Sequence, residues 1–411
     1  MIYKDNLKSN LIIILLSIIF SFLIIFFSKN NILWEGFFNT FNIKTLWPPF
    51  ADIRSHQYFS LSIDQGYNPY SEHPNDPWNR TANYPFIWYY ISKYLNLINN
   101  NFFLVFTFLM IFFYTFSFSK LSFSLYKNKP FFILSILMFF SSSSMLAIER
   151  GNSDLILFFL IFFSCYFTNY ILKILFLSIS IILKIYPIIV SYIFINKIRD
   201  ILIFILIIFL VFIFNFSEIQ YFIKNTSSSY SSGFVYGIKS ILNGYPKAFE
   251  RIGFNISQNS IIDFVIYLSL LLLIILFFFI GLRQKKITHY GSSLSLNEKL
   301  FLCGSTIYII TFLLFSNYDY RLIFLILTLP YIAQKKNLFY DYIFLLSIII
   351  SLNSIIIFKF ATTPMHFLII GSLIHFFKVF ILLYLTLNVS KIVRDNIDFL
   401  AFRVFKFLCK M

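Results

Sequence analysis

The chain has 411 residues, of which 59% are hydrophobic and only 12% charged, and its mean hydropathy is +0.80. Apolar runs of about 18 or more residues are transmembrane candidates, and the many runs here indicate a polytopic membrane protein. The net charge of +16 is assigned to Lys and Arg at cytoplasmic helix ends rather than to nucleic-acid binding, because no basic soluble domain is evident. The widely spaced Cys165, Cys303 and Cys409 predict neither a disulfide framework nor a zinc site.

The hydropathy pattern predicts an all-α membrane bundle of about twelve spans with both chain ends in the cytoplasm. Ten of the spans are Leu11–Phe27, Asn101–Ser119, Phe131–Ile148, Leu155–Thr168, Ile201–Phe216, Ile261–Leu282, Leu300–Phe315, Leu322–Ala333, Tyr342–Phe358 and His366–Asn388. Lys and Arg in the short inner connections set the orientation. The basic, aromatic tail, residues 391–411, is expected to form an amphipathic helix on the cytoplasmic surface.

The run Ile171–Asn196 can be drawn as one helix with Lys184 at its centre or as two short passes that meet at Lys184. A lysine at mid-membrane costs about 2.5 kcal/mol or more, and Pro187 marks a natural break. We therefore favour two passes, which complete the count of twelve.

The chain is expected to form a single membrane-embedded domain, and residues 28–100 form its first outer loop. This loop contains Trp47–Tyr90, the most polar long segment of the sequence. Asp52–Asp64 is expected to form a short interfacial helix, Gly66–Pro69 has the composition of a turn, and Tyr84–Leu97 is too short to span. A second outer loop, residues 217–259, is rich in Ser, Asn, Gly and Tyr.

Four polar clusters are predicted to meet on the outer face: the Asp52 loop, Glu149–Asp154, Lys184–Pro187 and Asn317–Arg321. Ionisable residues at membrane helix ends are costly and are therefore functional candidates. The clusters set three cations beside three carboxylates, namely Arg150, Lys184 and Arg321 with Glu149, Asp154 and Asp319. Such a set suits an ion-paired cavity for a phosphate. The alternative is a set of helix-end salt bridges that only stabilise the bundle.

The sequence contains no P-loop, HExxH, GxSxG or Cys/His pair. A carboxylate that faces cations in an outer cavity suits sugar transfer from a lipid-phosphate donor. The carboxylate takes the proton of the acceptor hydroxyl, and the cations stabilise the departing phosphate. A nucleotide-sugar donor fits less well, because nucleotides are cytosolic.

Short motifs in this order resemble those of the polyprenyl-phosphate-dependent glycosyltransferases of the GT-C class, most closely glycosyltransferase family 87. Asp52 follows the first span, and Asp64 to Tyr70 reads DQGYNPY. Asn83-Tyr84-Pro85 comes next, with Phe86 in place of the second proline of "Y-P-P". The motifs ERGNSD at 149–154, Lys184-x-Tyr186-Pro187 and NYDYR at 317–321 resemble further motifs of the group, so the likeness covers roughly residues 45–330.

The resemblance implies an inverting GT-C fold in the plasma membrane, with its site on the outer side. Asp52 would be the general base, and Arg150, Lys184 and Arg321 would hold the donor phosphate, oriented by Glu149 and Asp319. The motif residues Asn152, Asp154, Tyr186 and Tyr320 join the binding set. The implied reaction transfers a hexose, mannose-like, from a polyprenyl-phosphate donor to a lipid-linked or cell-envelope glycan. No metal is required, although Asp52 with Glu72 or His73 is a possible ligand set.

Several other residues of the first outer loop are supporting candidates: His56, Asp64, Asn68, Tyr70 and Tyr84. His73 and Asp76 are expected at the loop surface. Lys378, inside the last span, is expected to pair within the bundle or to extend toward the interface.

Two other classes of protein remain open from the sequence. A transporter or flippase for lipid-linked sugars would suit the buried charge and the broken helix around Lys184. It is disfavoured because the halves show no repeat and the clusters gather at one face. A surface-polysaccharide polymerase or ligase usually relies on a large late outer loop, whereas here the early loop holds the acidic residues.

Overall fold

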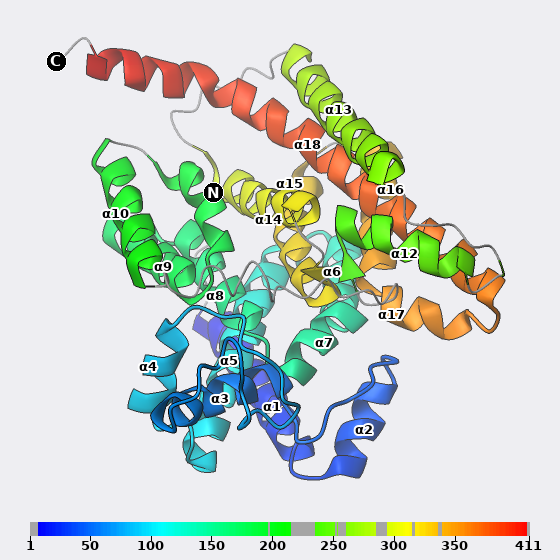
Figure 1. Ribbon diagram of the computed structural model, residues 1–411. Coiled ribbons are helices and arrows are strands. Elements are labelled where there is room, and N and C mark those ends of the chain that lie inside the picture. Colours follow the sequence, from blue (N-terminus) through cyan, green and yellow to red (C-terminus); the bar gives the residue numbers. More distant parts are fainter. Residues whose placement is uncertain are drawn as a thin grey trace. The chain divides into compact units, whose positions relative to one another are not determined.

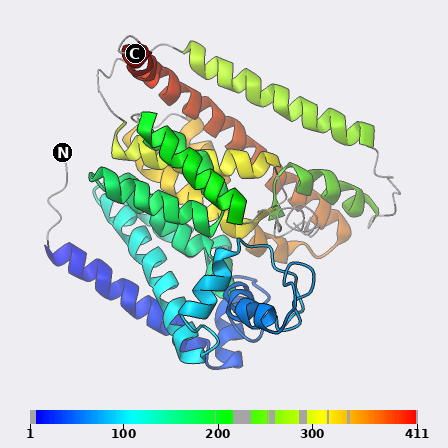
Figure 2. The same ribbon diagram turned by 60° about the vertical axis from the view of Figure 1, so that its left-hand side comes forward.

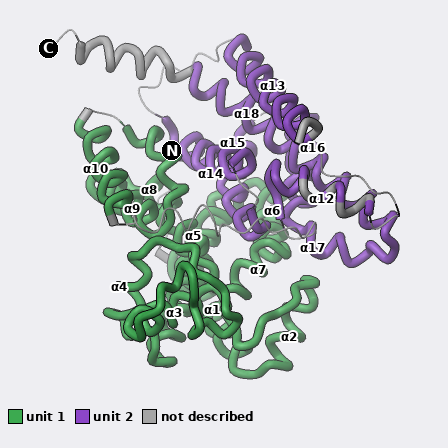
Figure 3. The backbone as a smooth tube through the Cα atoms, in the orientation of Figure 1, with its two compact units in different colours: residues 1–227 green, residues 228–411 purple. Residues whose placement is uncertain are grey.

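The apolar runs of the sequence fold into helices, because a backbone in an apolar environment must satisfy its hydrogen bonds within the segment. The computed structural model describes residues 7–195, 198–214, 235–250, 253, 260–284, 294–314, 317–335 and 339–408. Within them the regular elements are helices and two strands of two residues each, which confirms the all-α prediction. The chain divides into two compact units, residues 1–227 and 228–411 (Figure 3).

Unit 1 is built around α5, which packs against α1 and α8, while α9 packs against α8. The helices α2, α3 and α4 gather at one end of this unit, where α3 packs against α4 (Figures 1 and 2). The elements are α1 (Leu7–Phe27), α2 (Asn31–Asn39), α3 (Ala51–Asp64), α4 (Ile87–Tyr94), α5 (Asn100–Ser124), α6 (Lys129–Phe139), α7 (Ser142–Arg150), α8 (Asp154–Tyr166), α9 (Tyr170–Leu183), the 3-10 helix η1 (Tyr186–Phe194) and α10 (Ile198–Phe214).

Local sequence signals fix where these helices start and stop. Asn169 caps α9 by accepting hydrogen bonds from the backbone N–H groups of the next turn. The helix ends at Leu183, Lys184 is extended, and η1 starts at Tyr186 with Pro187 in its first turn. The predicted break at Lys184 is therefore confirmed, as are the short helices of the first outer loop. Neither α9, with 14 residues, nor η1, with nine, is among the candidate spans of the described residues, so the two passes expected here are not found.

Unit 2 is arranged around the long helix α18, which packs against α13, α14 and α16. Strand β1 pairs antiparallel with β2, with Val235 opposite Tyr318. The elements are β1 (Val235–Tyr236), α12 (Ile238–Glu250), α13 (Ser260–Arg283), α14 (Leu296–Leu314), β2 (Asn317–Tyr318), the 3-10 helix η2 (Asp319–Thr328), α15 (Leu329–Gln334), α16 (Phe339–Leu352), α17 (Ser354–Ile357), η3 (Phe358–Phe360) and α18 (Pro364–Leu408).

The prediction of about twelve spans is wrong. Among the described residues five helices are long and apolar enough to cross a membrane, or up to seven if each of two bent pairs forms one span. The discrepancy comes from apolar runs that form short helices: α8 has 13 residues and α9 has 14, whereas about 20 residues are needed to cross. The run Leu322–Ala333 is divided between η2 and α15. The chain remains a multi-pass helical membrane protein.

Two predicted segments lie partly outside the described residues. Of the second outer loop, residues 217–259, the structure describes 235–250 and residue 253, which include β1 and α12. Of the tail, residues 391–408 continue α18 as one helix, and 409–411 lie outside the description.

A buried ion pair joins the elements of unit 2. Lys378 on α18 places its Nζ 2.9 Å from Asp319 Oδ1 at the start of η2 and donates to the carbonyl of Val235 in β1. Ser354 donates to the other oxygen of Asp319, and neither charged side chain is more than 1% exposed. The sequence left the role of Lys378 open between pairing and extension to the interface, and the structure shows pairing.

We expect Lys378→Met to destabilise unit 2 strongly. Removing one partner of a buried pair leaves an uncompensated charge and typically costs about 3–5 kcal/mol. The double variant Lys378→Met/Asp319→Leu should recover much of this loss, because no charge then remains buried. Thermal unfolding in detergent measures the effect. The matched control is Lys93→Met, which removes an exposed ion pair with Asp64 and should change little. A double variant less stable than Lys378→Met would contradict the pairing argument.

Candidate functional site

The site in unit 1 begins where α3 meets the end of α7. Gly151 caps α7 with φ +58°, and a Cβ there would lie 2.8 Å from Ile53 Cγ2 and 3.0 Å from Phe50 Cβ. Glycine is therefore required both for the left-handed conformation and for the close approach of α3. Phe50 N donates to Glu149 O at 3.2 Å. This junction brings the first turn of α3, with Asp52, against the residues that follow Gly151.

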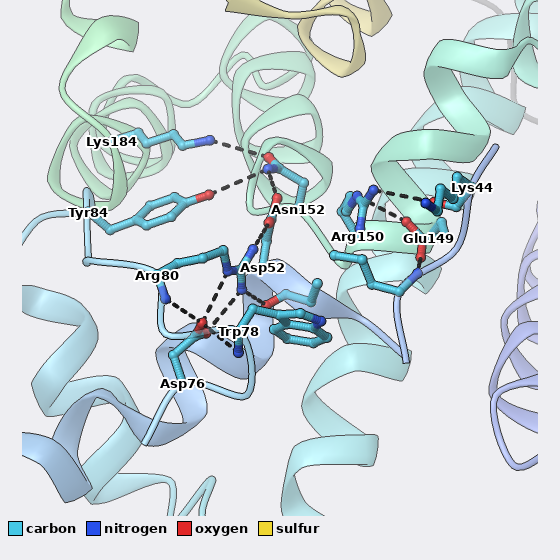
Figure 4. Close-up of polar contacts among 12 residues, drawn as sticks. Lys44, Asp52, Asp76, Trp78, Arg80, Tyr84, Glu149, Arg150, Asn152 and Lys184 are labelled. Carbon is cyan, nitrogen blue, oxygen red and sulfur yellow. Dashed lines mark hydrogen bonds and ion pairs between the residues drawn. The ribbon is translucent and has the colours of Figure 1, made fainter. Parts of the chain in front are cut away.

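Asp52 is held at both carboxylate oxygens. Asn152 Nδ2 donates to Oδ2 at 2.6 Å, and Arg80 Nη1 donates to Oδ1 at 3.3 Å (Figure 4). The side chain is 15% exposed, so it is not sealed inside the bundle.

Asn152 is the centre of the polar network. Its Oδ1 accepts from the backbone N–H of Asp154 at 2.9 Å and from Lys184 Nζ at 3.3 Å. Its Nδ2 donates to Asp52 and, at 3.4 Å, to Tyr84 Oη. Because the amide oxygen faces two donors, its NH₂ group must face the carboxylate.

Lys184 approaches this amide from the break between α9 and η1. Its Nζ lies 2.5 Å from Asp154 Oδ1 and 5.2 Å from the centroid of the Tyr84 ring. Tyr186 donates to the same Asp154 oxygen at 2.9 Å, and Trp88 Nε1 donates to the carbonyl of Leu183 at 3.1 Å. The lysine is thus only 8% exposed and lies among aromatic side chains and a carboxylate.

A tight turn after Pro74 supplies Arg80. Asp76, which is 2% exposed, accepts hydrogen bonds from the backbone N–H groups of Trp78 and Arg80. Its two oxygens also bind the Arg80 guanidinium. The expectation that Asp76 lies at the loop surface is therefore wrong.

His56 lies one turn of α3 beyond Asp52 and is buried between aromatic rings. Its ring stacks on Trp88 with centroids 3.9 Å apart and meets Tyr84 edge-on at 4.1 Å. Burial lowers the pKa of His56 well below 6.5, and the nearby charges of Lys184 and Arg80 lower it further. The imidazole is therefore neutral near pH 7, and its Nε2 has no hydrogen-bond partner among the described residues.

Glu149 and Arg150 form a second polar group beside the first. Arg150 Nε lies 3.1 Å from Glu149 Oε2, and Glu149 Oε1 accepts from Leu46 N at 2.9 Å. Arg150 Nη2 reaches the carbonyl of Lys44. Figure 4 shows this pair turned toward the segment before α3 and away from Lys184. The union of Arg150 with Lys184 around one phosphate stays a prediction.

The remaining candidates of the first outer loop are dispersed. Asp64 forms an exposed ion pair with Lys93. Asn68 accepts from Tyr70 N, and Tyr70 Oη donates to the carbonyl of Tyr84, so these two residues support the Tyr84 segment rather than the centre of the site.

His73 is buried, contrary to the surface position expected for it. Its Nδ1 lies 2.8 Å from Ser62 Oγ, and its Nε2 lies 3.2 Å from Ser55 O. Both ring nitrogens are therefore engaged and unsuited to a metal with Asp52. In the part of the chain that the structure describes, no group of three or more His, Cys, Asp or Glu side chains is placed to hold a metal ion.

The fourth predicted cluster belongs to unit 2. Arg321 Nη1 donates to Asn317 Oδ1, and Tyr320 is 9% exposed. Asp319 was expected to orient Arg321, but its ion pair is with Lys378, because α18 brings that lysine to the start of η2. The meeting of this cluster with those of unit 1 stays a prediction.

Two site residues, Arg80 and Asp76, were not among the candidates from sequence. Their spacing of four residues, Asp76-x-x-x-Arg80, was a usable signal for a local ion pair. The contact of Arg80 with Asp52, 28 residues away, depends on the path of the loop and has no signature in the sequence.

We expect acid to destabilise the protein partly through His56, which lies outside the candidate spans. The pKa of His56 is lower in the folded state than in the unfolded state. As the pH falls, the unfolded state therefore binds the proton first. Its contribution to stability is full above pH 6.5 and is lost as the pH falls toward the folded pKa. At one pH unit below 6.5, the free energy of unfolding has decreased by about 1.4 kcal/mol.

Thermal unfolding between about pH 7.5 and about pH 5.5 tests this linkage. His56→Phe and His56→Gln remove the titrating group, and both should unfold with a smaller dependence on pH than the parent chain. Equal pH dependence in all three proteins would contradict the assignment.

Similarity to known proteins adds no assignment to this site. No protein-family model matches the chain, and no curated protein or solved structure matches it significantly. The resemblance of the short motifs to GT-C glycosyltransferases remains an expectation, and the function must be argued from the chemistry of the site.

Proposed function

We propose that the chain is a membrane glycosyltransferase of GT-C type. It transfers a hexose from a polyprenyl-phosphate donor to a lipid-linked or cell-envelope glycan on the outer side of the plasma membrane. The observation that carries the proposal is the polar network Asp52–Asn152–Lys184–Asp154, which joins the first turn of α3 to the break between α9 and η1. Buried charges of this kind are costly and are rarely kept without a function.

Asp52 has the properties required of a general base. A carboxylate offers about four lone-pair positions, and Arg80 and Asn152 use one on each oxygen. The other positions remain for the hydroxyl of the acceptor. The carboxylate takes the hydroxyl proton as the acceptor oxygen attacks the anomeric carbon.

Lys184 supplies positive charge for the leaving group. As the bond from the anomeric carbon to the phosphate oxygen breaks, the electron pair leaves with the polyprenyl phosphate. A cation fixed in a poorly solvated site stabilises that developing charge more than it would in water. Lys4 and Lys8, which precede the first span, favour an outer position for the loop that carries Asp52, as a lipid-linked donor requires.

A transporter or flippase of lipid-linked sugars is the second candidate. It is favoured by the break of the chain at Lys184 between α9 and η1, since broken helices with a charged residue are typical of transport sites. A transport function does not explain why two donors, Arg80 and Asn152, hold the carboxylate of Asp52.

We expect Asp52→Asn to lower sugar transfer by about 10²–10⁴-fold, the usual contribution of a general base. The asparagine keeps the shape of the side chain but cannot take the proton. Purified protein in detergent, a polyprenyl-phosphate mannose donor with a labelled sugar, and a membrane lipid extract as acceptor measure the rate.

The matched control is Glu35→Gln, which alters an exposed carboxylate on α2 of the same unit and should retain the parental rate. Undiminished transfer by Asp52→Asn would remove Asp52 from the base role. Absence of transfer, together with movement of the labelled lipid across liposomes, would support the transporter instead.

At low pH, we expect Asn152→Asp to lower the rate of sugar transfer more than Asn152→Ala does. The new carboxylate would stand 2.6 Å from Asp52 Oδ2, where the amide nitrogen now lies, and two carboxylates this close share a proton. Transfer by Asn152→Asp should therefore recover as the pH is raised, whereas Asn152→Ala should show a uniform loss. Parallel pH–rate profiles for the two variants would argue against direct contact with the base.

A further inference from the structure

Asp76 fixes the turn that carries Arg80. Its Oδ2 accepts from Trp78 N at 3.1 Å, from Arg80 N at 2.9 Å and from Arg80 Nε at 3.2 Å, and its Oδ1 accepts from Arg80 Nη2 at 3.1 Å. The Asp76 side chain is fully buried. One carboxylate thus fixes both the backbone of the turn and the guanidinium that it carries.

The Arg80 guanidinium then spans from this anchor to the start of α3. Nη2 also donates to the carbonyl of Ala51 at 2.6 Å, while Nη1 donates to Asp52 Oδ1 at 3.3 Å. The Trp78 ring covers the guanidinium, with a distance of 4.8 Å to the ring centroid. Burial by itself lowers the pKa of Arg80, but the hydrogen bond to Asp76 and the charge of Asp52 outweigh it and raise the pKa. Arg80 is therefore permanently charged.

We propose that Arg80, anchored by Asp76, is the positioning residue for the Asp52 carboxylate. The inference rests on the proposed function, because it assigns Arg80 a role in the use of Asp52 as base. Arg80 and Asn152 hold opposite oxygens of the carboxylate, which fixes its rotation.

A simpler role for Arg80 would be to fasten the loop onto α3 through the carbonyl of Ala51. The two roles differ in one respect: only a positioning role makes the chemistry of Asp52 depend on the guanidinium itself. Arg54 provides a matched comparison on the same helix. It donates to Pro49 O and Gln57 Oε1 and lies 4.5 Å from the centroid of Phe103, but it makes no ion pair with a carboxylate among the described residues.

The first experiment compares Arg80→Ala, Arg80→Lys, Asp76→Asn and Arg54→Ala in the polyprenyl-phosphate mannose assay. We expect Arg80→Ala to lower kcat by about 10–100-fold, as small misplacements of reacting groups do, with KM for the donor little changed. Arg80→Lys keeps the charge but loses the planar geometry of the guanidinium. Its kcat should lie between those of the parent chain and Arg80→Ala. Asp76→Asn should also lower kcat, by a smaller factor than Arg80→Ala.

Chemical rescue separates positioning from loop fastening. Millimolar guanidinium should restore part of the kcat of Arg80→Ala, because it can occupy the vacated position beside Asp52. Arg54→Ala should lose thermal stability, keep kcat near the parental value and gain nothing from guanidinium. A parental kcat in Arg80→Ala, or a raised donor KM with unchanged kcat, would overturn the proposal.

A second measurement needs no substrate. Carbodiimides modify accessible carboxyl groups, and mass spectrometry reports modification at Asp52. Arg80→Ala removes the guanidinium that contacts Asp52 Oδ1 and should increase modification of Asp52 several-fold, whereas Arg54→Ala should not. Unchanged modification overturns the positioning role even if the parent chain transfers no sugar. An active, Asp52-dependent enzyme with unaffected Arg80 variants overturns only this inference, whereas inactivity of the parent chain bears on the proposed function.

Discussion

The structure depends on one constraint: a charge inside an apolar helical chain must find a partner. A charge left alone in such surroundings costs several kcal/mol, and two of the buried ion pairs join segments that are distant in sequence. Asp154 pairs with Lys184 across 30 residues in unit 1, and Asp319 pairs with Lys378 across 59 residues in unit 2. In unit 1 the pair lies beside the break between α9 and η1, and in unit 2 it joins α18 to the start of η2.

The two units use this constraint differently. In unit 2 the lysine, the carboxylate, a serine and a backbone carbonyl satisfy one another, and a closed arrangement of this kind suits the packing of α18. In unit 1 the network continues outward from Lys184 through Asn152 to Asp52, whose side chain is partly exposed. A network that ends at an accessible carboxylate is the better candidate for chemistry.

How much of the structure the sequence predicts depends on whether an interaction is local or joins residues that are distant in sequence. The break at Lys184 was predictable, since a buried lysine and a proline act locally on the helix that contains them. The number of spans was not, because an apolar run does not reveal that it will fold as a 13-residue helix or as the 3-10 helix η2. Tertiary packing decides such lengths.

The grouping of the site residues shows the same limit. Glu149 and Arg150 are close in sequence to Asn152 and were expected to act with Lys184. The left-handed turn at Gly151 instead directs the residues before and after it to different partners. Arg80 was missed for a related reason, since its contact with Asp52 exists only through the fold of the turn that Asp76 organises.

In the proposed mechanism, the neutral amide of Asn152 separates Asp52 from Lys184. A direct contact with Lys184 would add a second cation to a carboxylate that already pairs with Arg80. The amide lies between them instead, with its NH₂ group toward the carboxylate and its oxygen toward the ammonium. Its dipole stabilises both charges at once, and hydrogen bonds in such a chain polarise one another. In the proposed reaction this arrangement keeps the proton acceptor and the phosphate-stabilising cation separate, since one would act on the incoming hydroxyl and the other on the departing phosphate.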